Sequence, residues 1–473
     1  MNDDRRSRRE FLRLTAGGAV LAAANGVGLS ASGAAGAEKE AELPRPTPAQ
    51  VAWQDCEVGL LYSFDLAIAA GAFAPNNTVR ERLDPGRYNP AKLDTDQWLE
   101  AAKAAGARYA VFTATHFNGF MQWQSDLYPY GLKQAAWRGG KGDVVGDFVA
   151  SCRKHKILPG LYFSTHRNVW WEVWGHYVNW GKGRGTDKQA AFNRIAEKMT
   201  EELCSRYGPL VQIWFDAGVK TPQEGGPDVL PVFEKHQPRS VFYHSKQRSD
   251  HRWIGNEQGR AGYPCWATMP RKDGEVSHNA RSWRPLLAGG DPEGTVWSPG
   301  MVDVPLRGAG GVHNWFWKPG QDAGALPTDA LVRMYHQSVG RNCNLILGEV
   351  VTSEGLVPQS DIERLGEFGK AIRARFGTPV AETKGDGREV TLDLKAPATI
   401  GHVTIMEDIA QGERVRSYEV EGLLPGNQWR KLCSGQSIGH KRIEAFTPVE
   451  LAKVRFRATK AAATPRIRKL SVL

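Results

Sequence analysis

The chain has 473 residues, of which 41% are hydrophobic and 24% charged, and its net charge is +10. These values are typical of globular proteins, and the length accommodates two or three domains, or one large barrel with an accessory module. No Lys/Arg run or nucleic-acid motif accompanies the positive charge, so we attribute it mostly to a solvated surface and predict no nucleic-acid partner. The 16 Trp residues suit a cleft that stacks on sugar rings, with packing in the core as the alternative.

The first 37 residues have the three ordered parts of an export signal. Residues 7–13 are close to the twin-arginine consensus, residues 16–29 are apolar, and Ala35-Gly36-Ala37 fits an A-x-A cleavage site. The apolar part is too short and too rich in Gly and Ala to span a membrane, and no other run of about 20 apolar residues follows. A disordered basic tail is the alternative. We therefore expect a periplasmic or secreted bacterial protein that keeps no stable membrane anchor, with a linker over residues 38–50.

The six cysteines are scattered along the chain. None forms a C-x-x-C motif, and no Cys/His cluster has the spacing of a zinc site. The sequence predicts no metal, no cofactor and no disulfide framework, and leaves a single bridge open.

Strands and helices alternate over residues 51–380. The clear helical periodicities cover residues 95–105, 144–156 and 188–207, the first preceded by a capping box from Asp94 to Gln97. The expected strands are 58–63, 109–115, 158–164 and 210–215, followed by the weaker 240–244, 295–297, 312–317 and 344–347. Alternation of this kind indicates a parallel sheet, and eight candidate strands predict an α/β fold, a TIM-type (β/α)8-like barrel.

A different pattern begins after one further helix, which a second capping box, Ser360 to Glu363, predicts and which ends near Phe376. From residue 381 to 473 the sequence alternates between polar and β-branched residues, with turn residues between the runs. This pattern predicts a C-terminal β-sandwich of the discoidin-like or carbohydrate-binding kind.

The apolar run Leu210–Phe215 ends in Asp216, followed by small Ala217 and Gly218. A buried strand should not end in an unpaired carboxylate for packing reasons, because burying the charge costs several kcal/mol. The carboxyl ends of barrel strands form the active-site face, so Asp216 is a candidate catalytic residue. The alternative is that Asp216 caps the next helix.

The stretches Tyr109 to Phe120 and Ile213 to Gly218, with several others, together resemble glycoside hydrolase family 29, the α-L-fucosidases. Ile213 to Gly218 is similar to the W-F-D-G motif of the family, and Tyr109 to Phe120 to its K-H-H-D-G-F strand. Residues 252–259 and stretches of the C-terminal domain resemble the branch of the family that prefers 1,3/1,4 linkages. The further stretches that carry the resemblance are residues 88–106, 407–414 and 437–442.

The resemblance implies a retaining glycosidase with two catalytic carboxyl groups. Asp216 matches the nucleophile of the family, and Glu257 lies where the family places its acid/base. We expect the two groups to lie about 5–6 Å apart, with Glu257 enclosed by Trp253 and Trp266. A salt bridge from Glu257 to Arg252 or Arg260 is the alternative to catalysis.

The sequence also departs from the family at the sugar-binding positions. Ser63 stands where the first strand usually ends in His, and His116-Phe117-Asn118-Gly119 replaces His-His-Asp-Gly. Losing two imidazole donors argues for a changed or loosened sugar preference. The predicted substrate-binding residues are Ser63, His116, Asn118, Trp123, Trp214 and Trp315.

The sequence therefore predicts an exported exo-α-L-fucosidase-like enzyme that acts on an oligo- or polysaccharide. Two alternatives remain open: a related α-L-glycosidase, for example one acting on α-L-galactosides, and a non-catalytic carbohydrate-binding protein. Retention of both Asp216 and Glu257 disfavours the second.

Overall fold

The computed structural model describes residues 42–73, 80–276 and 283–473. The predicted signal, residues 1–37, lies outside the described residues. Among the helices of the described part, none combines the length and the apolar character that crossing a membrane requires.

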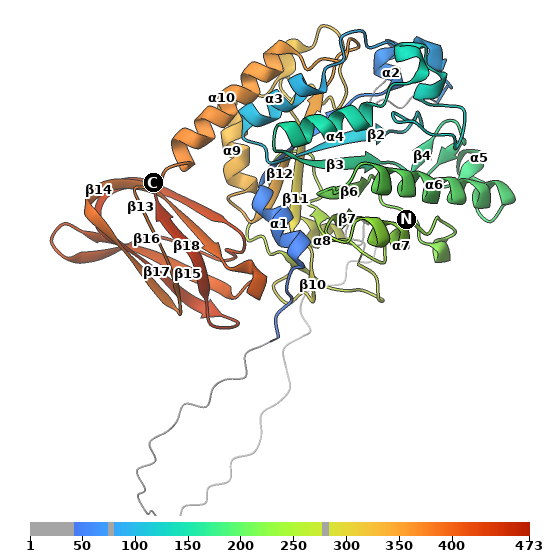
Figure 1. Ribbon diagram of the computed structural model, residues 1–473. Coiled ribbons are helices and arrows are strands. Elements are labelled where there is room, and N and C mark those ends of the chain that lie inside the picture. Colours follow the sequence, from blue (N-terminus) through green and yellow to red (C-terminus); the bar gives the residue numbers. More distant parts are fainter. Residues whose placement is uncertain (1–41, 74–79, 277–282) are drawn as a thin grey trace, which may run out of the picture. The chain divides into compact units, whose positions relative to one another are not determined.

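Eight parallel strands form one sheet in the order β7-β6-β3-β2-β1-β12-β11-β8. Within the described ranges, strand pairing joins every neighbour in this order and is lacking only between the two end strands, β7 and β8, so the sheet is a nearly closed (β/α)8-like barrel (Figure 1). The predicted fold class is confirmed. The barrel strands are β1 (Val58–Ser63), β2 (Tyr109–Thr115), β3 (Leu158–Phe163), β6 (Gln212–Phe215), β7 (Val241–Tyr243), β8 (Arg252–Trp253), β11 (Gly300–Pro305) and β12 (Cys343–Val350).

Helices cover the outside of the barrel. The helix α3 shows why: Trp98, Leu99, Ala101, Ala102 and Ala105 are buried and give it one apolar face against the sheet. The longer helices are α1 (Pro48–Cys56), α3 (Thr95–Ala105), α4 (Val144–Lys154), α6 (Asp187–Arg206), α7 (Val229–His236), α9 (Thr328–Ser338) and α10 (Gln359–Phe376). The short ones are α2 (Leu66–Ala69), α5 (Val178–Gly181) and α8 (Arg284–Leu287).

The two predicted capping boxes differ in outcome. The Asp94 side chain accepts from the backbone N–H groups of Asp96 and Gln97, as an N-cap should. The Gln97 amide instead bonds the backbone of Val357, so it joins α3 to the chain before α10. The second box is wrong, because α10 begins at Gln359, which leaves Ser360 inside the helix.

Two weakly marked strands were placed wrongly. Residues 295–297 contribute β10 (Val296–Trp297), which pairs antiparallel with β9 (Thr268–Met269) outside the barrel. Residues 312–317 form no strand and belong to the loop between β11 and α9. The barrel uses β8 and β11 in their place. A second small antiparallel pair joins β4 (Arg167–Asn168) and β5 (Val173–Trp174).

The barrel interior is closed by an apolar cluster below the carboxyl ends of the strands. Alternate residues along each strand point inward, and the cluster includes Leu61, Val111, Trp214, Met301 and Ile346. This plug makes the interior a packed core and leaves space for a ligand only at the carboxyl ends.

The C-terminal residues form the predicted β-sandwich. Its six antiparallel strands are β13 (Ala381–Asp386), β14 (Glu389–Glu407), β15 (Val415–Leu424), β16 (Gln428–Gly435), β17 (Arg442–Ala461) and β18 (Arg466–Val472). The long β14 and β17 serve both layers: residues 389–393 pair with 453–457 beside β15, whereas residues 402–405 pair with 442–445 beside β18. Register shifts between the two halves let these strands cross from layer to layer.

Candidate active site

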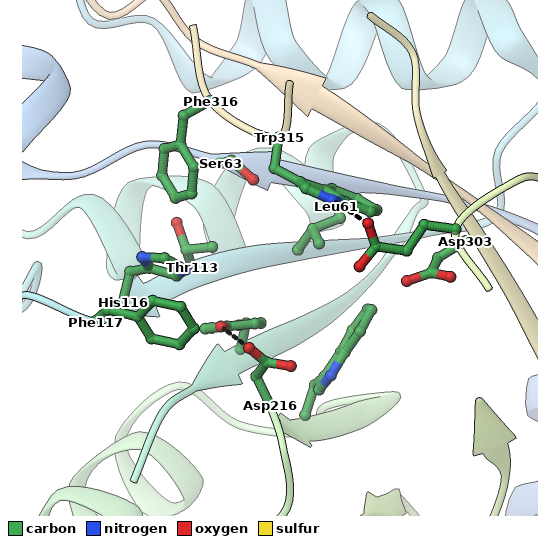
Figure 2. A pocket seen from close by; sticks show the side chains of 12 residues that line it. Leu61, Ser63, Thr113, His116, Phe117, Asp216, Asp303, Trp315 and Phe316 are labelled. Carbon is green, nitrogen blue, oxygen red and sulfur yellow. Dashed lines mark hydrogen bonds between the residues drawn. The ribbon is translucent and has the colours of Figure 1, made fainter. Parts of the chain in front are cut away.

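A cavity of about 170 Å³ opens at the carboxyl ends of the barrel strands (Figure 2). Strands and the loops that directly follow them supply its walls, which mix carboxyl groups with aromatic rings. Its lining residues are Leu61, Ser63, Thr113, His116, Phe117, Tyr162, Trp214, Asp216, Glu257, Asp303, Trp315 and Phe316.

Asp216 directly follows β6 and faces this cavity (Figure 2). The Tyr162 hydroxyl donates to its Oδ2 at 2.8 Å, and the Ala217 backbone N–H donates to its Oδ1 at 2.9 Å. Position 218 must be glycine, because its φ is 77° and a Cβ there would lie 2.7 Å from the His244 ring. Burial raises the pKa of Asp216, while the bonds from Tyr162 and Ala217 counteract that rise. These bonds hold the carboxylate in one orientation.

Glu257 enters the same cavity from the loop after β8. Its Oε2 accepts from Trp315 Nε1 at 3.0 Å and bonds His313 Nε2 at 2.6 Å. The alternative salt bridges are not formed: Arg252 donates to Leu287, Ser298 and Cys265, and Arg260 donates to Gln258.

The expected surroundings of Glu257 need correction. Trp315 supplies its aromatic contact, whereas Trp253 donates its indole N–H to Asp303, and Trp266 packs under the Arg416 guanidinium. The Glu257 side chain is 41% exposed, so it lies at the mouth of the cavity and is not enclosed. The 5–6 Å separation from Asp216 stays a prediction.

The predicted binding residues Ser63, His116, Trp214 and Trp315 all line the cavity. Burial, with the nearby Arg167 charge, lowers the pKa of His116 to about 3, so its ring is neutral at physiological pH. Neither His116 Nδ1 nor Trp214 Nε1 has a hydrogen-bond partner in the described part of the chain. Buried polar atoms without a partner are costly, and both atoms gain if a ligand hydroxyl bonds them.

Asn118 and Trp123 lie outside the lining of the cavity, which corrects their assignment as substrate-binding residues. The Asn118 amide donates to Asp65 Oδ2 at 2.8 Å and supports the N-terminus of α2. Trp123 is fully buried and donates its indole N–H to Glu202 at 2.7 Å. Both are structural because their polar groups are satisfied within the protein.

The structure adds residues that sequence reasoning missed. Tyr162 is the penultimate residue of β3, so the rule that singled out Asp216 could have found it. Asp303 and His313 had no such signal, because β11 was not recognised and the loop after it was taken for a strand. Their contacts with Trp253 and Glu257 are visible only in the folded chain.

A barrel whose strand ends bring carboxyl groups and aromatic rings into one cavity has the arrangement that a glycoside hydrolase of the (β/α)8 type requires. The family model described as Alpha-L-fucosidase matches residues 85–375. The chain thus belongs to the α-L-fucosidase family, glycoside hydrolase family 29.

Individual relatives agree over most of the chain. Alpha-L-fucosidase 1 of Arabidopsis thaliana is 28% identical over 468 residues, which cover 90% of this chain and 86% of the plant protein. A protein of Bacteroides thetaiotaomicron VPI-5482 whose crystal structure is known is 42% identical in sequence. The match covers 91% of this chain and 99% of the bacterial chain, and the two structures superpose with a TM-score of 0.86. The structure of a glycoside hydrolase 29 family member from an unknown rumen bacterium is 28% identical, with coverages of 91% and 77% and a TM-score of 0.75.

Proposed function

We propose that the protein is a retaining exo-glycosidase that releases terminal α-L-fucosyl residues, or closely related α-L-sugars, from an oligo- or polysaccharide. The observation that carries this proposal is the placement of Asp216 and Glu257 in one cavity at the strand ends. The relative named Alpha-L-fucosidase 1 supports the sugar class.

The proposed reaction has two steps. Asp216 attacks the anomeric carbon and forms a glycosyl ester, while Glu257 donates a proton to the departing oxygen. Glu257 then takes a proton from water, which attacks the anomeric carbon; the bond from that carbon to Asp216 breaks, so the sugar is released and Asp216 returns as a carboxylate. The Tyr162 and Ala217 donors fix the attacking carboxylate, and His313 and Trp315 fix the acid/base.

Sugar preference is the finer part of the proposal. We expect a preference for 1,3/1,4 linkages, in keeping with the branch that residues 252–259 resemble. Ser63 in the lining puts a small hydroxyl where the family usually has an imidazole, which favours a changed preference. An α-L-galactoside, which carries one more hydroxyl than an α-L-fucoside, is therefore the second candidate substrate.

The test is turnover of a panel of aryl α-L-glycosides by the wild type and by Asp216→Gly. We expect hydrolysis of the fucoside, a loss of at least about 10³-fold in kcat in the variant, and partial rescue by azide. Asp126→Gly, at an exposed aspartate outside the cavity, is the matched control and should keep wild-type kcat. Wild-type kcat in Asp216→Gly would refute the assignment, and sugar binding without turnover would favour a carbohydrate-binding protein.

We also propose that the protein acts outside the cytoplasm, in the periplasm or after secretion. The twin-arginine-like segment, the apolar stretch and the A-x-A site in residues 1–37 support this proposal.

A further inference from the structure

Asp303 is a third carboxyl group in the cavity, with no role in the two steps above (Figure 2). It lies on β11, two residues after Met301, so both side chains point into the barrel. Met301 belongs to the apolar plug, and Asp303 sits one layer above it at 5% exposure. A carboxyl group on the floor of a cavity, over an apolar layer, is poorly solvated.

Its two oxygens have different surroundings. Trp253 Nε1 donates to Oδ1 at 2.8 Å, and the Asp303 backbone N–H also interacts with the carboxyl group; in the described ranges no side chain donates a hydrogen bond to Oδ2. The Asp303 backbone carbonyl accepts from Gly259 N–H at 3.3 Å, which ties β11 to the loop that carries Glu257. The side chain is thus held by one oxygen while the other is left to the cavity.

The three carboxyl groups differ in how well a negative charge is stabilised. Asp216 accepts from Tyr162 and Ala217, and Glu257 accepts from Trp315 and bonds His313, whereas the only side chain that donates to Asp303 in the described ranges is an uncharged indole. The cavity lining contains no Lys or Arg, and the nearby Arg167 charge favours ionised Asp216, so a further negative charge at Asp303 would be repelled by its neighbours. Asp303, which is 5% exposed, is therefore the group that stays protonated throughout the reaction, whereas Glu257 releases and regains its proton.

The electrostatics agree with the geometry. Burial raises the pKa of Asp303 well above its usual range, the Glu257 charge raises it further, and the Trp253 bond opposes the rise only in part. The titratable groups that face Asp303 are Glu257 from the loop after β8, Asp216 after β6 and Tyr243 on β7. None of them is a cation, so none favours the ionised form.

We propose that Asp303 is a specificity-determining residue: an uncharged carboxylic acid whose Oδ2–H donates a hydrogen bond to a hydroxyl of the bound sugar. The proposal rests on the proposed function and specifies one contact between its site and the sugar. A carboxylic acid kept neutral by its site can donate a hydrogen bond through its O–H group, which a carboxylate cannot do. It supplies a donor in a site where Ser63 has replaced an imidazole.

The variant Asp303→Asn tests the charge state. Its amide oxygen can accept from Trp253 while its N–H faces the cavity, so it reproduces the neutral acid and cannot reproduce the carboxylate. We expect kcat/KM on the aryl glycoside that the wild type hydrolyses best to stay within about tenfold. Asp303→Ala, which removes the donor, should lose about 10- to 100-fold. An Asn variant as impaired as the Ala variant would overturn the proposal.

Two further readouts separate a sugar contact from a merely structural role. The first readout uses a series of monodeoxy glycosides, each lacking one hydroxyl. Loss of the hydroxyl that Asp303 contacts should lower the activity of the wild type and leave the activity of Asp303→Ala almost unchanged. Equal losses in both enzymes for every deoxy substrate would refute the contact. The carboxyl ¹³C NMR signal that disappears in Asp303→Asn should have the shift of a protonated acid at neutral pH, and a carboxylate shift would overturn the proposal. This last measurement needs no substrate, so it decides the charge of Asp303 even if the wild type hydrolyses no α-L-glycoside and the proposed function fails.

Discussion

The bond between Tyr162 and Asp216 gives the sharpest prediction about catalysis. Tyr162→Phe deletes the hydroxyl that donates to Asp216 Oδ2 at 2.8 Å and keeps the ring, which packs between His116 and Trp214. Burial already raises the pKa of Asp216, and the Tyr162 bond opposes that rise. Without the bond the pKa rises further, so Asp216 is protonated, and inactive as a nucleophile, up to a higher pH.

The size of the effect follows from the strength of such a bond. A hydrogen bond to a charged group contributes about 1.5–3 kcal/mol, and one pKa unit corresponds to about 1.4 kcal/mol. The acidic limb of the kcat/KM profile should therefore move up by about 1–2 pH units. The plateau should change less, because Asp216 is ionised there in both enzymes.

The assay is kcat/KM against pH on an aryl α-L-glycoside with a good leaving group, for which the acid/base matters least. Tyr130→Phe is the control, because it removes a hydroxyl from another buried tyrosine that does not line the cavity. An unmoved acidic limb in Tyr162→Phe would mean that the limb does not report Asp216, and the nucleophile assignment would lose its support.

Three other predictions concern the acid/base, stability and export. Glu257→Gln should slow the hydrolysis of substrates with poor leaving groups far more than that of activated aryl glycosides, and equal losses of rate on both would contradict its role as acid/base. Burial acts to raise the pKa of Glu57, but the neighbouring Lys441 ammonium and hydrogen bonding outweigh it and lower that pKa. Glu57→Gln should thus lower the free energy of unfolding by about 1–3 kcal/mol at neutral pH, and urea titrations should show the difference shrinking as the pH falls below about 4.3; a pH-independent difference would argue against the ion pair. N-terminal sequencing of the exported protein should show cleavage after Ala37, and a mature chain that retains Arg8 would refute export by this route.

The first half of the barrel could be predicted closely from the sequence. β1, β2 and β3 are apolar runs of six or seven residues, and β2 was placed at the residues where it begins and ends. Helices α3 and α6 carry long periodic faces, which fix element type better than any single residue. Asp216 followed from the same reasoning, because a carboxylate that ends an apolar strand has no packing explanation.

The second half could not be predicted, for two physical reasons. β8 is two residues long, too short to show any period. β11 contains Gly300, Asp303 and Pro305, residues that are depleted in strands, although all six of its positions are buried. The apolar run at residues 312–317 had the composition of a strand because Trp315 and Phe316 turn toward the cavity and not because they pair with a neighbour.

Part of the cavity is built where the sequence pattern fails. An interior strand position that packs on the apolar plug is free to be Val or Leu, whereas most positions that line the cavity are polar or aromatic. Asp303 breaks the apolar pattern of β11 because it lines the floor of the cavity, and His313 and Trp315 break the loop pattern because they hold Glu257. Hydrophobic periodicity and residue propensity predict an element less well where its residues contact a ligand instead of packing in the core. The half of the barrel that the sequence marks weakly therefore adds Asp303 to Ser63 and His116 of the first half as proposed determinants of sugar preference.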